Sequence, residues 1–165
     1  MEAKKFKTGM YGGKFMPFHK GHLYCATVAA QMCETLYVVL FHGGEQELKI
    51  LEQRPNDQWL KPESRLERMK KACKDLKNVK VVDIDITDCK KADGTEDWDM
   101  ETPLVLKTCG KLDAVFGSES GYEEYFQRAY PGAKVVIIDE ERKIVPISGT
   151  MIRNMNEEER RVWMV

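Results

Sequence analysis

Short apolar runs alternate with longer helix-like stretches along the whole chain, and this alternation constrains the fold more than any other feature. The runs rich in β-branched and aromatic residues are typical of strands, and the stretches between them repeat apolar residues at helical spacing. Strands separated by helices favour a parallel sheet covered by helices on both faces. The chain is therefore predicted to be an α/β protein with a five-stranded parallel sheet. The expected strands are residues 8–13, 35–41, 78–86, 113–119 and 133–139.

Helices are expected between these strands, and their ends carry recognisable signals. The first is predicted over residues 19–34, with apolar positions 3.6 residues apart. Another begins at Pro62, a favoured first helical residue. Shorter helices are predicted in 102–111, 120–132 and 148–154, and a helical or frayed tail in 157–165. The segment 43–61 is polar and interrupted by Gly and Pro, so a long loop is predicted there. The acidic segment 88–100 is also predicted to be a loop.

Size and composition bound the class of protein. A chain of 165 residues with 42% hydrophobic and 32% charged residues suits one globular domain. A formal net charge of -1 gives no general attraction for nucleic acid or an anionic membrane, and no apolar run is long enough for a membrane span. The five cysteines form no Cys-x-x-Cys pair and no apolar stretch follows the first lysines. Reduced thiols in a cytoplasmic protein without a secretory signal are expected.

The segment "GGKFMPFHKGH", residues 12–22, follows the first predicted strand and leads into the first predicted helix. In open α/β sheets, ligands bind beyond the carboxyl ends of the strands, where such loops lie. Gly12 and Gly13 permit close backbone approach, His19 and His22 flank the helix start, and Lys14 adds a cation. Because a helix N-terminus offers free N–H groups and a partial positive charge, the segment favours a phosphate site.

Two other interpretations of the histidines stay open at this point. A zinc site could use His19 and His22, although His42 is the one other histidine in the sequence and no cysteine lies nearby. Alternatively, both rings could simply cap and pack the helix start. The Gly-x-x-x-x-Gly-Lys-Ser/Thr pattern of a P-loop and the Gly-x-Gly-x-x-Gly pattern of dinucleotide binding are both absent.

The spacing Gly-x-Phe-x-Pro-x-His-x-Gly-His, from Gly13 to His22, resembles the HIGH-type signature of the nucleotidyltransferase superfamily. Members of that superfamily transfer a nucleoside monophosphate from ATP or CTP to a phosphate and release pyrophosphate. The resemblance implies that His19 and His22 contact the transferred phosphate and that Lys14 contacts a substrate phosphate. It also assigns nucleotide binding to the neighbouring positions of the motif, which are Gly12, Gly13, Phe15 and Gly21.

A second motif, "ISGTMIR" at residues 147–153, resembles the Ile-Ser-Ser-Thr-x-Ile-Arg signature of the same superfamily. It departs from that signature at Gly149, which replaces the second serine and removes one hydroxyl. Ser148 can cap the predicted helix, and Arg153 lies one turn further on. The resemblance implies that Ile147, Ser148, Thr150 and Arg153 bind the nucleotide, with Thr150 and Arg153 on the β- and γ-phosphates and Arg153 counted among the catalytic residues.

Taken together, the segments "KTGMYGGKFMPFHKGHL", "GSESGYEEYF" and "VPISGTMIR" look most like the nicotinamide-nucleotide adenylyltransferase domain of bifunctional enzymes that also carry a ribosylnicotinamide kinase. The resemblance implies a single Rossmann-like domain over residues 1–165. It also implies AMP transfer from ATP to nicotinamide mononucleotide, with Mg²⁺ held mainly by the substrates. Kinase activity is not expected, because only twelve residues follow Arg153. Cytidylyltransferase, pantetheine-phosphate adenylyltransferase and a non-catalytic nucleotide sensor are the alternatives, and association into a homo-oligomer is left open.

The remaining candidates are less specific. Gly117 and Ser118 end the fourth predicted strand, where the nucleotide ribose and base lie in the family. Trp98 lies in a polar loop and could stack on the nicotinamide ring, and Trp59 could do the same. His42 follows the second predicted strand and could line the pocket. The alternating carboxylates of Asp83, Asp85 and Asp88 could bind a metal or form a solvated edge; no metal ligand is assigned.

Overall fold

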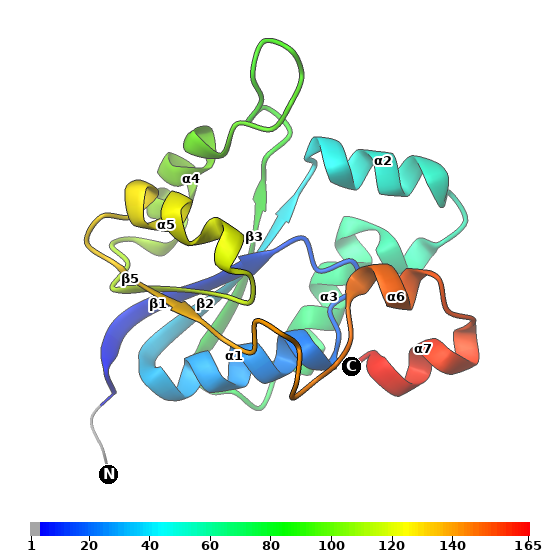
Figure 1. Cartoon of the computed structure of the whole chain (residues 1–165), viewed down its shortest axis with the longest axis horizontal. Coiled ribbons are helices and arrows are strands. Elements are labelled where there is room, and N and C mark those ends of the chain that lie inside the picture. Colours follow the sequence, from blue (N-terminus) through cyan, green and yellow to red (C-terminus); the bar gives the residue numbers. More distant parts are fainter. Residues whose placement is uncertain (1–3) are drawn as a thin grey trace.

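The computed structural model describes residues 4–165 and contains one sheet in which all five strands run parallel. The strand order is β3-β2-β1-β4-β5, so β1 lies at the centre (Figure 1). This confirms the predicted α/β class and the five-stranded parallel sheet. The strands are β1 (Phe6–Gly13), β2 (Cys33–His42), β3 (Val79–Asp85), β4 (Ala114–Gly117) and β5 (Lys134–Ile137).

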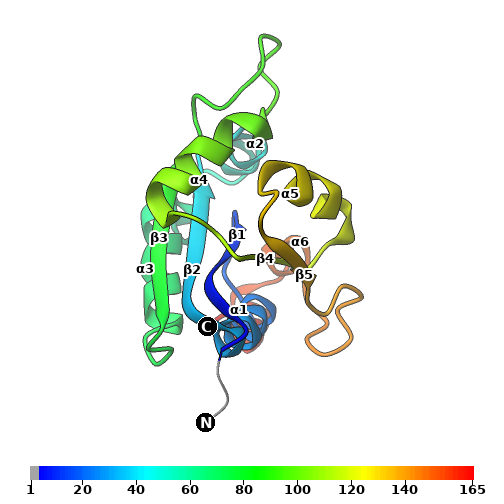
Figure 2. The same cartoon turned by 90° about the vertical axis from the view of Figure 1, so that its left-hand side faces the viewer.

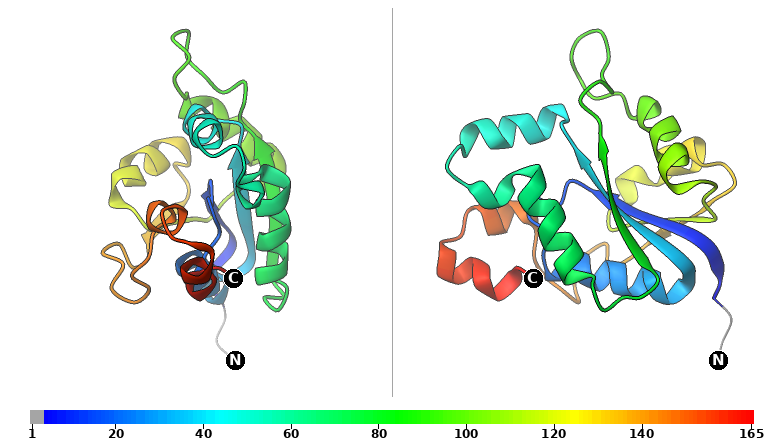
Figure 3. Two further views of the ribbon diagram at one scale, coloured as in Figure 1. Left: turned by 90° about the vertical axis from the view of Figure 1, so that its right-hand side faces the viewer. Right: turned by 180° about the vertical axis from the view of Figure 1, so that it is seen from behind.

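Seven α-helices and three short 3₁₀ helices connect and follow these strands within residues 4–165. The α-helices are α1 (Lys20–Met32), α2 (Glu45–Gln53), α3 (Pro62–Ala72), α4 (Glu101–Cys109), α5 (Glu123–Ala129), α6 (Gly149–Arg153) and α7 (Glu157–Trp163). The 3₁₀ helices are η1 (Gln58–Leu60), η2 (Trp98–Met100) and η3 (Ser120–Tyr122). The views from the side and from behind show α3 lying along β3 (Figure 3).

The two faces of the sheet bury separate apolar clusters because side chains alternate along each strand. On β2, Leu36, Val38 and Leu40 point into the cluster that also contains the buried residues of α1 and α3. Val39 points into the other cluster, beside Val105 of α4. Helices therefore cover both faces, as the sequence predicts. Figure 2 shows the carboxyl end of β1 between α2 and α4 on one side and α5 on the other.

The prediction of a long loop over residues 43–61 is wrong, because nine of these residues form α2. Gly43 and Gly44 precede the helix rather than interrupting it, and the helix ends at Gln53, before Pro55. Its buried side chain is Glu47, whereas Leu48 is 53% exposed. The helix is nevertheless amphipathic, with Ile50 and Leu51 partly buried on the same face as Glu47, so the loop prediction gave too much weight to the polar composition and the flanking Gly and Pro residues.

The C-terminal part returns to the first helix. The backbone of His19 pairs with Met164 in an isolated antiparallel bridge, and the Arg68 side chain donates to the Val165 main-chain oxygen. All five cysteines are free and buried, which agrees with the expected reduced thiols. Across residues 4–165, no helix combines the length and the apolar character that crossing a bilayer requires.

Candidate active site

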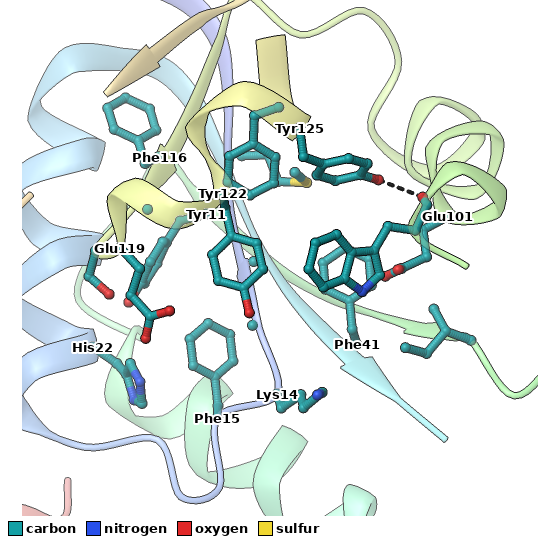
Figure 4. A pocket seen from close by; sticks show the side chains of 18 of the residues that line it. Tyr11, Lys14, Phe15, His22, Phe41, Glu101, Phe116, Glu119, Tyr122 and Tyr125 are labelled. Carbon is teal, nitrogen blue, oxygen red and sulfur yellow. Dashed lines mark hydrogen bonds between the residues drawn. The ribbon is translucent and has the colours of Figure 1, made fainter. Parts of the chain in front are cut away.

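A cavity of about 330 Å³ lies beyond the carboxyl ends of β1 and β4 (Figure 4). Its position is the usual ligand site of an open parallel sheet, where neighbouring strands are followed by connections on opposite faces. Figure 4 shows His22 and Glu119 at one end of the cavity and Glu101 and Tyr125 at the other. Of the residues predicted from the sequence, those lining it are Gly12, Gly13, Lys14, Phe15, His22, Gly117, Ser118 and Trp98.

The other predicted residues are outside the cavity wall. They lie around the ends of α1 and α6 and are His19, Gly21, Ile147, Ser148, Thr150 and Arg153. A Cβ added to Gly21 would lie 2.9 Å from the His19 ring and 3.6 Å from Ile147, so these positions from two motifs are in contact. The structure thus divides the predicted residues into a group facing the cavity and an adjoining group at the start of α1 and along the short helix α6.

Both histidines cap the start of α1 through their Nδ1 atoms. His19 Nδ1 accepts a hydrogen bond from the Gly21 N–H at 3.0 Å, and His22 Nδ1 accepts from the His19 N–H at 3.2 Å. A neutral imidazole whose Nδ1 accepts must carry its proton on Nε2. The cap therefore leaves each ring with an Nε2–H donor that does not belong to the helix.

Both rings are strongly biased towards the neutral form. Burial, followed by the charge of Arg142, lowers the pKa of His19 to about 4. Burial also lowers the pKa of His22 well below its usual value, with smaller effects of His19 and Arg142 in the same direction. At neutral pH the two histidines are thus uncharged, and each ring can donate one hydrogen bond through Nε2–H.

The two rings are stacked, with centroids 3.6 Å apart, but only His22 reaches the cavity. His19 is 1% exposed, and its Nε2 is buried without a hydrogen-bond partner among residues 4–165. A buried polar atom without a partner costs free energy, so its presence needs an explanation. A phosphate oxygen is an acceptor that would satisfy it, and the helical cap alone does not.

Helix α6 begins next to the loop that follows β1. Ser148 caps it by accepting from the Met151 N–H at 3.2 Å, as predicted. Arg153 donates to the Met16 main-chain oxygen at 2.8 Å and to Thr150 Oγ1 at 3.2 Å. The two sequence motifs, more than 120 residues apart, therefore lie together in the fold.

The glycine that departs from the family signature has a steric reason. A Cβ on Gly149 would lie 3.0 Å from the Met16 main-chain oxygen and 3.2 Å from Arg153 Nη1. Gly12 is similarly restricted, because its Cβ would lie 2.5 Å from Phe41 Cε2. Gly149 therefore lets α6 approach the loop after β1 closely, and Gly12 leaves room for the Phe41 ring of β2.

Lys14 is held between two other segments at the cavity wall. Its Nζ donates to Gln46 Oε1 of α2 at 2.7 Å and lies 3.5 Å from Glu96 Oε1. A Lys ammonium is a mobile point charge, so a phosphate entering the cavity can compete with Glu96 for it. The predicted contact between Lys14 and a substrate phosphate remains a hypothesis that this position allows.

The two candidate tryptophans occupy different places. Trp98 lines the cavity and is 37% exposed, with ring centroids 5.1 Å from Tyr122 and 5.4 Å from Tyr125. Trp59 is outside the cavity wall and lies under the Arg160 guanidinium at 4.7 Å. The geometry therefore favours Trp98 as the stacking residue and gives Trp59 a packing role.

Arg142 is the main cavity residue that the sequence analysis missed. It lies in the turn after β5, in the left-handed region at φ 53°, and Asp139 fixes this turn by accepting the N–H groups of residues 143–145. Its Nη1 donates to the Ile147 main-chain oxygen at 2.6 Å, and its Nη2 is 3.8 Å from Glu119 Oε1. An arginine five residues before the second motif was a usable signal for this position.

The metal interpretations find no support in the geometry. His42 Nε2 lies 2.9 Å from Asp83 Oδ2, and Asp85 accepts from the N–H and hydroxyl of Thr87. Within residues 4–165, no group of three or more His, Cys, Asp or Glu side chains is placed to hold a metal ion. His42 is outside the cavity wall and therefore does not line the pocket. Its contact in the structure is the pairing with Asp83.

Comparisons with known proteins agree with this geometry. A family model described as cytidylyltransferase-like matches residues 10–155, which is most of the chain. Among curated proteins, the phosphopantetheine adenylyltransferase of Mycoplasma capricolum is 27% identical over 149 residues, covering 90% of this chain and 96% of the relative. The corresponding protein of Mycoplasma mycoides is 25% identical over the same length.

Solved structures with the same fold include two of NadR protein. One is in complex with NAD and AMP-PNP and has a TM-score of 0.67 at 22% identity, and the other is in complex with NR and has a TM-score of 0.65. A bifunctional NMN adenylyltransferase/ADP ribose pyrophosphatase from Francisella tularensis has a TM-score of 0.62 at 17% identity. In the order given, these three matches include 98%, 99% and 93% of this chain. They include less than half of each solved chain, namely 46%, 43% and 44%.

The family match extends across both sequence motifs, from within β1 to beyond α6. It includes the two histidines of the α1 cap, the cavity residues and Arg153, whose contact with Met16 joins the motifs. The chain is therefore a member of the cytidylyltransferase-like family of nucleotidyltransferases.

Proposed function

We propose that this chain transfers AMP from ATP to nicotinamide mononucleotide and forms NAD and pyrophosphate. The observation that carries the proposal is the position of Trp98, whose ring lines the same cavity as His22 and Lys14. A flat aromatic acceptor can stack there, with its phosphate directed towards the α1 cap. Pantetheine would instead favour an apolar channel, and the Trp98 end carries Glu96, Glu101 and Tyr hydroxyl groups.

The fold comparison supports this proposal in a limited way. One NadR structure that shares the fold contains NAD together with AMP-PNP, so the product and an ATP analogue are ligands of that protein. The identity is 22%, and that similarity by itself concerns the fold. The support for a nicotinamide acceptor comes instead from the residues that line this chain's own cavity, above all Trp98.

In the proposed reaction, an oxygen of the acceptor phosphate attacks the α-phosphorus of ATP. The new P–O bond forms as the bond to the pyrophosphate oxygen breaks, and pyrophosphate leaves with that electron pair. The attacking phosphate is already an anion, so the reaction needs no general base. Catalysis is then positioning and stabilisation of charge on the transferred phosphate.

The protein groups for this stabilisation lie at the His22 end of the cavity. His22 Nε2–H can donate to an oxygen of the transferred phosphate, and the Arg142 guanidinium supplies a permanent positive charge beside it. His19 is stacked on His22 outside the cavity wall, so its unpartnered, buried Nε2 can reach the same anion only if substrate binding uncovers the ring. These donors are held by the α1 cap and the Asp139 turn, so little reorganisation is needed during reaction.

The leaving pyrophosphate is assigned to the start of α6. Ser148, Thr150 and Arg153 provide a helix cap, a hydroxyl and a guanidinium at one location. Mg²⁺ would enter on the ATP phosphates, held mainly by their oxygens and by water, and would neutralise phosphate charge.

Phosphopantetheine is the second candidate acceptor, and the curated relatives favour it. Both are phosphopantetheine adenylyltransferases that align over 90% of this chain. The phosphate-binding motifs are shared by both reactions, so they do not choose between acceptors. The choice depends on the far end of the cavity, where Trp98 and its tyrosine neighbours lie.

The test is an acceptor comparison. Purified protein is incubated with ATP and Mg²⁺ and with nicotinamide mononucleotide or phosphopantetheine, and pyrophosphate release and the nucleotide product are measured. The proposal predicts release and NAD formation with nicotinamide mononucleotide and at least tenfold lower kcat/KM with phosphopantetheine. The reverse preference would reject it. ATP binding without turnover for any acceptor would identify a nucleotide sensor instead.

A further inference from the structure

The end of the cavity farthest from His22 combines aromatic rings with carboxylates. Trp98 and Tyr122 come from different segments, η2 and η3, and each is 37% exposed although both are large and largely apolar. The Tyr125 hydroxyl donates to the Trp98 main-chain oxygen and so connects α5 to η2. These rings therefore form an open aromatic wall, held together before any ligand binds.

Two glutamates border this wall. Glu96 Oε2 accepts from the Trp98 indole N–H at 3.3 Å, and its Oε1 is 3.5 Å from Lys14 Nζ. Glu101, at the first turn of α4, also lines the cavity, and it forms no ion pair among the residues that the structure describes. Two carboxylates thus lie near one ammonium group. A bound phosphate that contacts Lys14 would weaken the attraction between Lys14 and these carboxylates.

The carboxylates at this end of the cavity already repel one another. Burial, with the charge of Glu96 as the next contribution, raises the pKa of Glu101 to about 7. Lys14 opposes this rise, and Asp97 adds to it. A positive ligand group placed between the two glutamates would relieve their repulsion and ionise Glu101, whereas a negative group would increase the repulsion.

We infer that Glu96 and Glu101 select the acceptor by charge, so that the cavity accepts a cationic pyridinium ring carrying an uncharged amide and rejects the corresponding acid. This inference rests on the proposed function and names the acceptor more closely. A pyridinium cation is attracted both by the face of Trp98 and by the carboxylates. The amide can also donate its N–H groups to a glutamate oxygen. An ionised ring carboxylate offers acceptors alone, is repelled by Glu96 and opposes ionisation of Glu101.

The same geometry predicts discrimination against a neutral ring. Reduced nicotinamide mononucleotide keeps the amide, ribose and phosphate, but its dihydropyridine ring has no positive charge. Nicotinic acid mononucleotide keeps the cationic ring but adds a carboxylate. These two analogues therefore separate the contribution of ring charge from that of the amide, with the phosphate-binding end unchanged.

The experiment measures kcat/KM for nicotinamide mononucleotide, its acid and its reduced form, with saturating ATP, and measures binding of each by calorimetry. The wild-type protein is expected to prefer the oxidised amide at least tenfold over each analogue. Glu101→Gln is expected to lower the amide-to-acid ratio at least fivefold, and Glu96→Gln is expected to act in the same direction. Glu124→Gln, on the exposed side of α5, is the matched control and should leave the ratio unchanged.

The outcomes separate this inference from the proposed function. Equal use of the amide and the acid by the wild-type protein would leave the adenylyltransferase proposal standing and overturn the charge selection. An amide-to-acid ratio that stays unchanged in both glutamine variants, each shown by thermal unfolding to be folded, would also overturn it. Turnover of phosphopantetheine with no turnover of any nicotinamide nucleotide would overturn the proposed function and this inference together.

Discussion

The guanidinium of Arg65 bridges the carboxylate of Glu47 and the main-chain oxygen of Lys14, and both charged side chains are almost completely buried. Arg65 Nη1 donates to the Lys14 oxygen at 2.6 Å, and Glu47 also accepts from the Gly43 N–H. This ion pair therefore ties α2 and α3 to the loops after β1 and β2. The cavity loop that carries Lys14 is held in place by a contact made outside the cavity.

Breaking this pair on one side should strongly destabilise the fold. Arg65→Met or Glu47→Gln leaves a buried polar or charged group without its partner, and each change is expected to lower the free energy of unfolding by about 3–5 kcal/mol. The double variant should cost clearly less than the sum, because it leaves no charge unpaired. Urea denaturation of the four proteins measures this coupling. Additive losses would show that the pair is not a coupled unit.

Removal of His22 should reduce the rate of the reaction and also remove one hydrogen bond of the α1 cap. His22→Ala deletes an Nε2–H donor at the cavity, and one well-placed donor of this kind contributes about 3 kcal/mol, or roughly a hundredfold in kcat. His42→Ala is the control, because His42 pairs with Asp83 outside the cavity. Pyrophosphate release under saturating substrates is the measurement. Equal rates for His22→Ala and the wild-type protein would reject a role in phosphate stabilisation.

His19 should make the protein acid-sensitive over a defined range. Its pKa is about 4 in the folded state, below its usual value of about 6.5 in an unfolded chain. The unfolded state therefore binds the proton first, and stability is lost as the pH falls from about 6.5 to about 4. His19→Asn can still accept the Gly21 N–H but cannot titrate there, so its stability should depend less on pH across this range. Nitrogen-15 NMR should show the Nε2–H tautomer at pH 6.

Arg142 should influence both the rate and the histidines. Arg142→Met removes a cavity cation, and we expect kcat to fall by about tenfold or more while Arg142→Lys recovers part of it. Because Arg142 contributes to the low pKa of His19, the same change to Met should raise that pKa, whereas Lys should preserve it. Titration by NMR tests this second effect. An unchanged His19 pKa in Arg142→Met would contradict the electrostatic effect of Arg142 on His19, whatever the change in kcat.

Glu101 should affect stability in the opposite direction to His19. Burial holds its pKa at about 7 in the fold, above the ordinary value of 4.5, so the folded state retains a proton that the unfolded state has lost. The free energy of unfolding therefore falls as the pH rises from about 4.5 to about 7. Each unit of difference between the folded and unfolded pKa corresponds to about 1.4 kcal/mol. Glu101→Gln should be more stable than the wild-type protein at pH 8 by a larger margin than at pH 5. A pH-independent margin in chemical denaturation would contradict this.

Local sequence patterns were enough to predict the sheet, the start of α1 and the start of α6. A strand buried on both faces needs a continuous apolar run, and a helix cap needs a suitable acceptor two or three residues from its donor. Both requirements act over a few residues, so "TLYVVLF", His19 and Ser148 carry the information themselves. The family resemblance assigned both motifs to one nucleotide, and they lie together because loops after parallel strands share one edge of the sheet.

The tertiary structure alone decided the buried ion pair that anchors α2 and the composition of the far end of the cavity. The buried residue of α2 is Glu47, and the charge of its carboxylate is compensated by Arg65, eighteen positions away on α3. Lys14 meets Glu96 across 82 positions, and Trp98 meets Tyr122 from another 3₁₀ helix. Such contacts compensate buried charge and build a binding surface between segments that are remote in the chain. Their energies depend on the whole packing, so no local pattern of apolar residues could indicate them.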